Sequence, residues 1–241
     1  MLRVHSIETF GTHEGPGIRL VVFLQGCNFY CLYCHNPDTR PLKGGVEMSP
    51  EEIIELLKKQ KPYFKDKGGL TISGGESLLQ REELLDLFKK AKKAGFHTAL
   101  DTNGSILDSD AKKLLEATDL VLLDVKHIDP VWHQKVTSAS NAPVLQFAKY
   151  LEENNIPMWL RYVLVPGYTD QKEFLHKWGT HFTQYKNIER VELLPFHTYG
   201  FYKYKELGIE NPLEDCPIPT KKQVQEVVDI FKKYFKEVYV R

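Results

Sequence analysis

The segment Cys27–Asn36 reads CNFYCLYCHN and holds three of the four cysteines of the chain. Three residues separate Cys27 from Cys31, and two separate Cys31 from Cys34. Thiolates this close together can bind one metal centre. Three sulfur ligands are one too few for a closed tetrahedral site. The centre therefore takes a fourth ligand from elsewhere, or it keeps one position open for a reacting molecule.

Three interpretations of these cysteines compete. A disulfide within the segment would leave one of its three cysteines unpaired, and nothing else in the sequence suggests an oxidising compartment. A zinc site with His35 as fourth ligand would require the adjacent Cys34 and His35 to bind one ion. A [4Fe–4S] cluster with three protein ligands would leave one iron open, although the spacing differs from that of ferredoxins. The segment by itself leaves the zinc site and the cluster open.

Length and composition indicate one domain over residues 1–241, long enough for a sizeable core. Lys plus Arg and Asp plus Glu number 32 each, so no global charge favours nucleic acid or a membrane surface. Residues 1–6 show no signal-peptide pattern, and no apolar run approaches the ~20 residues of a membrane span. We expect a cytoplasmic protein that binds neither nucleic acid nor membranes. No heptad pattern demands self-association, so we expect a monomer.

Strand and helix patterns alternate along the chain, which predicts a parallel α/β architecture. The expected strands are 4–10, 18–24, 70–72, 97–100, 120–125, 158–165, 191–194 and 237–240. The expected helices are 82–93, 109–116, 143–153, 170–182 and 222–235, with another that begins after Ser49. About six strand–helix units are too few for a full eightfold barrel. We therefore predict a partial parallel (β/α)6 barrel, with a tyrosine-rich irregular stretch at 197–219.

Polar side chains gather where the expected strands end, which is where parallel α/β proteins bind ligands. The groups that follow or lie within these strands are Cys27, Cys31, Cys34, Ser73–Glu76, Asp101–Gly104, Asp124, Lys126, Arg161 and His197. This arrangement predicts one site at one edge of the sheet.

Each of these groups also has a simpler interpretation. Gly74 and Gly75 fit a tight turn as well as a ligand-facing backbone. Asp101 and Asp124 fit turn or cap positions, but two carboxylates on neighbouring strand ends would repel unless a cation lay between them. Arg161, inside an apolar strand, needs a partner, such as a carboxylate ligand or one of these two aspartates.

The late aromatic stretch also has two interpretations. His197 fits an ordinary loop histidine as well as a ligand-binding one. The late tyrosines fit core packing or a surface for a protein partner.

Several motifs in order resemble the pyruvate formate-lyase activating enzymes of the radical S-adenosylmethionine (SAM) superfamily. They cover essentially the whole chain. They are 14–19 (EGPGIR), 27–36, 73–76 (SGGE), 101–104 (DTNG), 123–126 (LDVK), 159–163 (WLRYV) and 193–197 (LLPFH). Activases of other glycyl radical enzymes carry a cysteine-rich insertion that holds further clusters. This chain has one cysteine outside the triplet, Cys216, so the simpler type fits best.

The resemblance implies an oxidoreductase that activates pyruvate formate-lyase under anaerobic conditions. In the family, a [4Fe–4S] cluster reductively cleaves SAM, and the resulting 5′-deoxyadenosyl radical removes hydrogen from a backbone glycine of the lyase. A reduced flavodoxin or ferredoxin is the expected electron donor. Within the single domain, the cluster loop would be 27–36, and a C-terminal part with the tyrosine-rich loop and last helix would be 197–241.

The same resemblance assigns residues. Cys27, Cys31 and Cys34 would hold the cluster. The residues expected around SAM are Tyr33, Asn36, Gly74, Gly75, Glu76, Asp101, Lys126, Arg161, Val163 and His197. A monovalent cation, Na⁺ or K⁺, would be bound by Asp101, Thr102, Asp124 and the Leu122 carbonyl. Glu14 occupies a position where the family usually has Asp, and the resemblance implies that it binds the substrate peptide. Its carboxylate lies one methylene further from the backbone than that of Asp.

Two alternatives remain. The activase of anaerobic ribonucleotide reductase shares the cysteine spacing, but it is generally shorter and lacks the LLPFH segment. A zinc-stabilised binding module without turnover would contain no inorganic sulfide.

Overall fold

The computed structural model describes residues 1–65 and 67–241, and the chain divides into two compact units. The first unit comprises Met1–Asn28 and Thr39–Leu122, and the second comprises Phe29–Asp38 and Leu123–Arg241. The boundary falls within the cysteine segment, so Cys27 belongs to the first unit and Cys31 and Cys34 to the second. The single domain expected over 1–241 stays a prediction.

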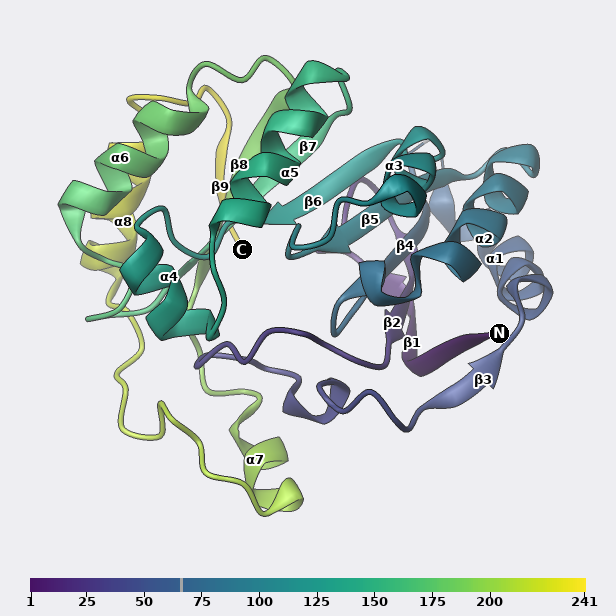
Figure 1. The fold of residues 1–241 in the computed structure, drawn as a ribbon, viewed down its shortest axis with the longest axis horizontal. Helices are drawn as coiled ribbons and strands as arrows, with labels where there is room; N and C mark the ends of the chain where they lie inside the picture. The colour runs from purple at the N-terminus through teal and green to yellow at the C-terminus, as the bar shows by residue number, and fades with distance from the viewer. Residues whose placement is uncertain (66) are drawn as a thin grey trace. The chain divides into compact units, whose positions relative to one another are not determined.

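The first unit is a mostly parallel sheet with helices packed against it (Figure 1). Its strand order is β3-β1-β2-β4-β5-β6. β1 is antiparallel to both β2 and β3, whereas β2, β4 and β5 pair in parallel. The bounds are β1 Leu2–Gly11, β2 Arg19–Leu24, β3 Val46–Met48, β4 Gly69–Gly74, β5 His97–Thr102, β6 Leu120–Asp124, α1 Pro50–Phe64, η2 Ser77–Gln80, α2 Arg81–Lys93 and α3 Ser109–Glu116.

Local sequence explains where these helices begin and end. Ser49 caps α1 in a capping box with Glu52, and Pro50 occupies the first turn, as the sequence predicts. α2 ends before Gly95, whose φ of 80° is a left-handed conformation that glycine adopts without strain. α1 packs against α2, and α2 packs against α3, so the three helices lie side by side (Figure 1).

The second unit contains the parallel strands β7-β8-β9 and five α-helices among its described residues. Every residue of β7 is buried, as expected of a parallel strand covered on both faces. α6 and α8 pack side by side (Figure 1). The bounds are η1 Pro37–Thr39, which ends at the boundary, α4 Pro130–Thr137, α5 Ala142–Glu153, β7 Met158–Leu164, α6 Lys172–Phe182, β8 Ile188–Pro195, α7 Phe201–Leu207, α8 Lys221–Phe231 and β9 Val238–Val240.

The predicted α/β class with a mostly parallel, unclosed sheet is confirmed, but some elements were missed. The stretch 197–219 is not wholly irregular, because it contains the helix α7. Gly200 at its N-cap supplies no side-chain cap, so the usual start signal is absent. α4 and the short strand β3 were also not predicted.

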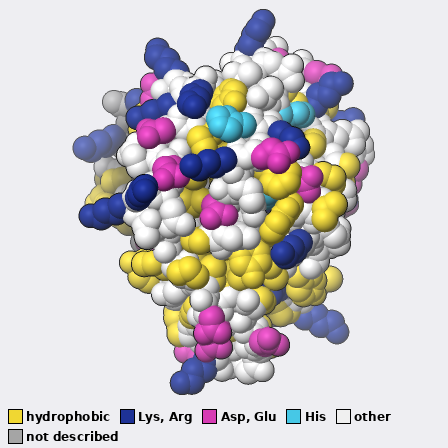
Figure 2. All heavy atoms as spheres, turned by 90° about the vertical axis from the view of Figure 1, so that its left-hand side faces the viewer, with side chains coloured by type: hydrophobic (Ala, Val, Ile, Leu, Met, Phe, Trp, Pro, Cys, Tyr) yellow, Lys and Arg dark blue, Asp and Glu magenta, His cyan; other side chains and the backbone are white. Residues whose placement is uncertain are grey.

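The surface mixes charges of both signs. Figure 2 shows Lys and Arg interspersed with Asp and Glu over the upper part of one face, and hydrophobic side chains in a band below them. Exposed large hydrophobic residues of the second unit include Val131, Tyr199, Tyr202 and Ile218. Within residues 1–65 and 67–241, no helix is long and apolar enough to cross a membrane.

Candidate functional site

The first unit brings its predicted site residues to one edge of its sheet. In the parallel register Leu24 lies opposite Gly74, and Ile72 lies opposite Leu100. The carboxyl ends of β2, β4 and β5 therefore meet at one edge, as the rule for parallel sheets requires. The residues at or just beyond those ends are Cys27, Gly74–Glu76 and Asp101–Asn103, the groups that the sequence places there.

Gly74 and Gly75 lie directly against the backbone that leads to Cys27. A Cβ on Gly74 would stand 2.2 Å from the Leu24 nitrogen, and one on Gly75 would stand 2.0 Å from the Gly26 oxygen. Gly75 donates its N–H to the Leu24 carbonyl at 3.0 Å. Neither position has room for a side chain, so these glycines allow close backbone packing. The predicted SAM contacts of both glycines are not tested by this packing.

Glu76 is fully buried, and its carboxylate accepts three hydrogen bonds. The donors are the Thr102 hydroxyl at 2.5 Å, the Asn103 N–H at 2.7 Å and the Leu78 N–H at 2.9 Å. Burial raises the pKa of Glu76 to about 7, although these hydrogen bonds lower it. The carboxylate thus fixes the loop after β5. Its predicted contact with the SAM amine remains a prediction.

Further hydrogen bonds join the loops at this edge. Ser73 donates to an Asp101 carboxylate oxygen at 2.7 Å, and the Ser77 hydroxyl donates to the Asp101 carbonyl at 2.9 Å. The Asn103 amide donates to the side-chain oxygen of Asn28, the residue after Cys27, at 3.0 Å. The loop after β5 is therefore tied both to β4 and to the start of the cysteine segment.

Arg19 holds the glycine-rich loop that carries Glu14. Its guanidinium is fully buried and donates to the Thr71 hydroxyl and to the Pro16 carbonyl. The Thr71 hydroxyl in turn donates to the Glu14 carbonyl at 2.6 Å. Burial lowers the pKa of Arg19 to about 10. The backbone around Glu14 is thus anchored from inside the first unit, while its side chain is half-buried.

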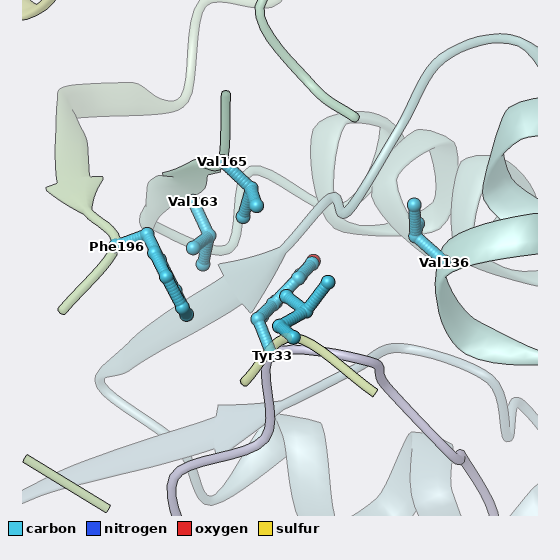
Figure 3. Packing of buried hydrophobic residues seen from close by; sticks show 6 residues of the cluster. Tyr33, Val136, Val163, Val165 and Phe196 are labelled. Atoms are coloured by element: carbon cyan, nitrogen blue, oxygen red, sulfur yellow. The ribbon is translucent and has the colours of Figure 1, made fainter. Parts of the chain in front are cut away.

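In the second unit, the cysteine segment is anchored to α4 and to an apolar cluster. The N–H groups of Tyr30 and Leu32 donate to the carbonyls of Thr137 and Val136 at 2.9 Å each. Tyr33 packs in a buried cluster, in which Figure 3 shows Val163, Val165 and Phe196 turned toward its ring. Cys31 packs against the same cluster. This packing fixes the backbone between Cys31 and Cys34.

Asp124 and Lys126 form a close ion pair at the end of β6. Lys126 Nζ lies 2.6 Å from Asp124 Oδ2 and 5.9 Å from the centre of the Tyr33 ring. Burial lowers the pKa of Lys126, but the Asp124 carboxylate and the neighbouring Tyr33 and Cys31 together outweigh it, so the pKa is raised. Lys126 therefore balances the charge of Asp124. The monovalent cation that the sequence places there stays a prediction.

Arg161 lies within β7, opposite Glu192 of β8. Its Nε donates to Glu192 Oε2 at 3.1 Å, and Glu192 also accepts from Arg241 Nη2 at 2.8 Å. Glu192 is thus a carboxylate partner of Arg161, whereas the sequence had suggested a ligand or one of the two aspartates for this role. Val163, two residues further along β7, has a relative exposure of 9% and belongs to the Tyr33 cluster.

His197 lies beside the end of the cysteine segment. Its ring stacks on His35 with centroids 3.9 Å apart, and His35 Nε2 lies 3.0 Å from the His197 carbonyl. Burial, and next the neighbouring His197 ring, lower the pKa of His35 to about 4. Asn36 accepts a hydrogen bond from Lys203 of α7 at 2.8 Å.

The four cysteines form no disulfide, and all four are described and half-buried. In the described part of the chain, no group of three or more His, Cys, Asp or Glu side chains is arranged to hold a metal ion. The ligand set Cys27, Cys31 and Cys34 therefore stays a prediction. Its chemistry, three half-buried thiols in one short segment, fits an iron–sulfur cluster.

Known proteins resemble this chain over nearly its whole length. The model of the radical SAM superfamily matches residues 21–178. A pyruvate formate-lyase-activating enzyme of Listeria monocytogenes is 44% identical, with 92% of each chain covered. The pyruvate formate-lyase 1-activating enzyme of Escherichia coli K12 is 42% identical, with 96% of each chain covered. The chain belongs to the pyruvate formate-lyase-activating enzymes of the radical SAM superfamily. Membership in this superfamily implies a [4Fe–4S] cluster and SAM as cofactors.

Solved structures support the fold. A domain of a pyruvate-formate lyase-activating enzyme from Bacteroides vulgatus superposes with a TM-score of 0.61 at 23% identity, covering 72% of this chain and 99% of that one. Streptococcus suis SuiB bound to its precursor peptide SuiA gives a TM-score of 0.71 at 14% identity. That match covers 92% of this chain and 48% of SuiB. Similarity at this level of identity concerns the fold alone, and the predicted partial barrel is consistent with it.

Sequence reasoning missed several residues that support the site. Glu192 could have been found, because a carboxylate inside an apolar strand gives the same signal as Arg161. Lys203 and Tyr204 gave no such signal, since they lie in a stretch that was interpreted as irregular. The link between Asn28 and Asn103 joins residues far apart in sequence, and no local pattern predicts it.

Proposed function

We propose that this protein activates pyruvate formate-lyase by generating a glycyl radical on it, under anaerobic conditions. The observation that carries the proposal is 44% identity over 92% of both chains to an enzyme named for that activity. When bound, the cluster and SAM supply a reductively formed 5′-deoxyadenosyl radical that removes a hydrogen atom from a backbone glycine of the lyase. The residues of the chain bind, orient and shield these groups.

Cys27, Cys31 and Cys34 would hold the cluster. Support comes from their spacing, from their half-burial and from the absence of a disulfide among these described residues. Three cysteine ligands leave one iron for the amino and carboxylate groups of SAM. The hydrogen bonds from Tyr30 and Leu32 to α4 would keep the loop in one conformation while SAM binds.

The residues proposed around SAM are Tyr33, Asn36, Gly74, Gly75, Glu76, Asp101, Lys126, Arg161, Val163 and His197. Arg161 and Lys126 are cationic and suit its carboxylate. The backbone at Gly74 and Gly75 suits close approach by a ligand. Asp101, Thr102, Asp124 and the Leu122 carbonyl offer oxygen atoms, the ligand type of a monovalent cation, Na⁺ or K⁺.

We further propose that Glu14 grips the substrate peptide, and that a reduced flavodoxin or ferredoxin supplies the electron. The anchored loop around Glu14 would present that carboxylate in a fixed position. We expect a cytoplasmic monomer that binds its lyase transiently.

The test is a reaction under anaerobic conditions with reconstituted protein, a reductant, SAM and purified pyruvate formate-lyase. We expect a glycyl radical signal in the electron paramagnetic resonance (EPR) spectrum of the lyase, together with lyase activity that depends on SAM. A sample that cleaves SAM but leaves this lyase silent, while it activates anaerobic ribonucleotide reductase, would refute the assignment to pyruvate formate-lyase.

A further inference from the structure

Lys203 of α7 holds Asn36, the last residue of the cysteine segment, and Asp38, two residues beyond it. Its ammonium donates to the side-chain oxygen of Asn36 at 2.8 Å, and it lies 2.9 Å from a carboxylate oxygen of Asp38. All three residues belong to the second unit. The side chain of Lys203 is 19% exposed and that of Asp38 is 25% exposed, so water screens this ion pair only partly.

Neighbouring residues fasten the same stretch of backbone. The buried hydroxyl of Tyr204 donates to the Cys34 carbonyl at 2.9 Å. Gly200 packs so closely on His35 that a Cβ there would meet the His35 oxygen at 2.7 Å. With the stacking of His197 on His35, residues 34, 35, 36 and 38 are each held by the segment 197–204.

The contact with Lys203 also decides which way the Asn36 amide faces. An ammonium group only donates, so the oxygen of the amide must face Lys203. The NH₂ group of Asn36, a donor, is therefore on the side of the amide that does not face the Lys203 ammonium. A donor in that direction suits a ligand group that accepts hydrogen bonds, such as a carboxylate or a ribose oxygen of SAM.

We propose that Lys203 is a positioning residue that fixes the Asn36 amide for SAM and, with Tyr204, holds residues 34–38 in place. The part that concerns SAM rests on the proposed function, whereas the part that concerns the segment 34–38 does not. In this role Lys203 acts through Asn36 and Asp38.

The first experiment measures amide hydrogen exchange in cluster-free protein. Lys203→Met keeps the aliphatic stem and removes the charge, Lys203→Arg keeps a donor, and Lys205→Met, at an exposed position of α7, is the matched control. We expect Lys203→Met to speed exchange in residues 34–38 about tenfold, because a charge-assisted hydrogen bond and an ion pair are lost together. Lys203→Arg should exchange more slowly than Lys203→Met, and Lys205→Met should match the unmodified protein. Equal exchange in Lys203→Met and Lys205→Met would overturn the proposal.

The second experiment is a double-mutant cycle on the KM for SAM in reconstituted protein. Lys203→Met should raise the KM about tenfold in the unmodified background, with a smaller change in kcat, and it should have little effect when Asn36→Ala is already present. If Lys203→Met raised the KM for SAM by the same factor in the Asn36→Ala background, Lys203 would act independently of Asn36. That result would overturn the orienting role. If the unmodified protein cleaves no SAM, the proposed function fails, and the exchange experiment alone still decides whether Lys203 holds the segment.

Discussion

Arg161 Nε lies 3.1 Å from Glu192 Oε2, and this carboxylate also accepts two hydrogen bonds from the last residue of the chain, Arg241. Glu192 is fully buried, whereas the side chain of Arg241 is 22% exposed. One carboxylate thus orients a proposed SAM residue and joins it to the C-terminus. A third guanidinium, that of Arg190, lies 3.6 Å from Glu192, so one carboxylate faces three arginines.

Glu192→Gln should lower the free energy of unfolding by about 3 kcal/mol, because the buried Arg161 guanidinium loses the charge of Glu192. Arg241→Ala should lower the free energy of unfolding by less, about 1 kcal/mol, since Arg241 is partly exposed and Glu192 still pairs with Arg161. Urea denaturation of cluster-free protein measures both, with Glu214→Gln at an exposed position as control. Equal stability of Glu192→Gln and Glu214→Gln would refute this role for Glu192.

Glu14→Ala should reduce lyase activation at least tenfold and leave uncoupled SAM cleavage almost unchanged. The reason is that Thr71 and Arg19 hold the backbone of the loop, so the loop keeps these anchors when the carboxylate and its hydrogen bond from the His13 N–H are removed. Glycyl radical yield and 5′-deoxyadenosine release, measured in parallel, separate the two activities. Thr12→Ala, at an exposed position in the same loop, is the control. Equal loss of both activities would count against a peptide-binding role.

Gly75→Ala should destabilise the protein by about 3 kcal/mol and lower the iron content after reconstitution. Its Cβ would meet the Gly26 oxygen at 2.0 Å, which forces the backbone before Cys27 to move. Gly95→Ala is the comparison, because nothing lies within 4 Å of its Cβ and only its left-handed φ of 80° is strained. That change should cost about 1 kcal/mol, with normal iron content. A Gly75→Ala protein as stable as Gly95→Ala would contradict the packing argument.

The contribution of His133 to stability should fall as the pH drops from about 6.5 to about 4. Burial lowers the pKa of the fully buried His133 from 6.5 to about 4, so in this range the unfolded chain takes up a proton that the folded chain does not. The contribution of His133 to the free energy of unfolding is therefore fully present above pH 6.5. It decreases by about 3 kcal/mol as the pH falls toward 4.

His133→Asn should flatten this part of the pH dependence. Its amide can still donate to the Ala139 carbonyl, which His133 Nδ1 contacts at 2.7 Å, but it does not titrate. Urea denaturation from pH 4 to 8 is the measurement. An unchanged slope in the variant would show that other groups cause the acid sensitivity.

Sequence patterns predicted most helices and parallel strands, because each of these elements carries its own signal. Ser49 and Glu52 form the capping box that starts α1, and residues 120–123 are wholly buried in β6 as their apolar run predicts. The edge where β2, β4 and β5 end was also predictable, since parallel strands end together.

Side-chain partners far apart in sequence could not be predicted in the same way. Lys203 and Asn36 are 167 positions apart, and neither has a pattern that indicates the other. The sequence suggested a cation between Asp101 and Asp124 to offset repulsion, but it gave no sign that Lys126 pairs with Asp124 or Ser73 with Asp101. Such pairings depend on tertiary packing, which no local pattern encodes.

The most direct test of the central claim is EPR spectroscopy of anaerobically reconstituted, reduced protein, recorded with and without SAM. A cluster held by three cysteines leaves an iron that SAM can reach. We predict the signal of a reduced [4Fe–4S]⁺ cluster that changes shape when SAM is added. A silent sample that contains one zinc ion and no inorganic sulfide would contradict the account.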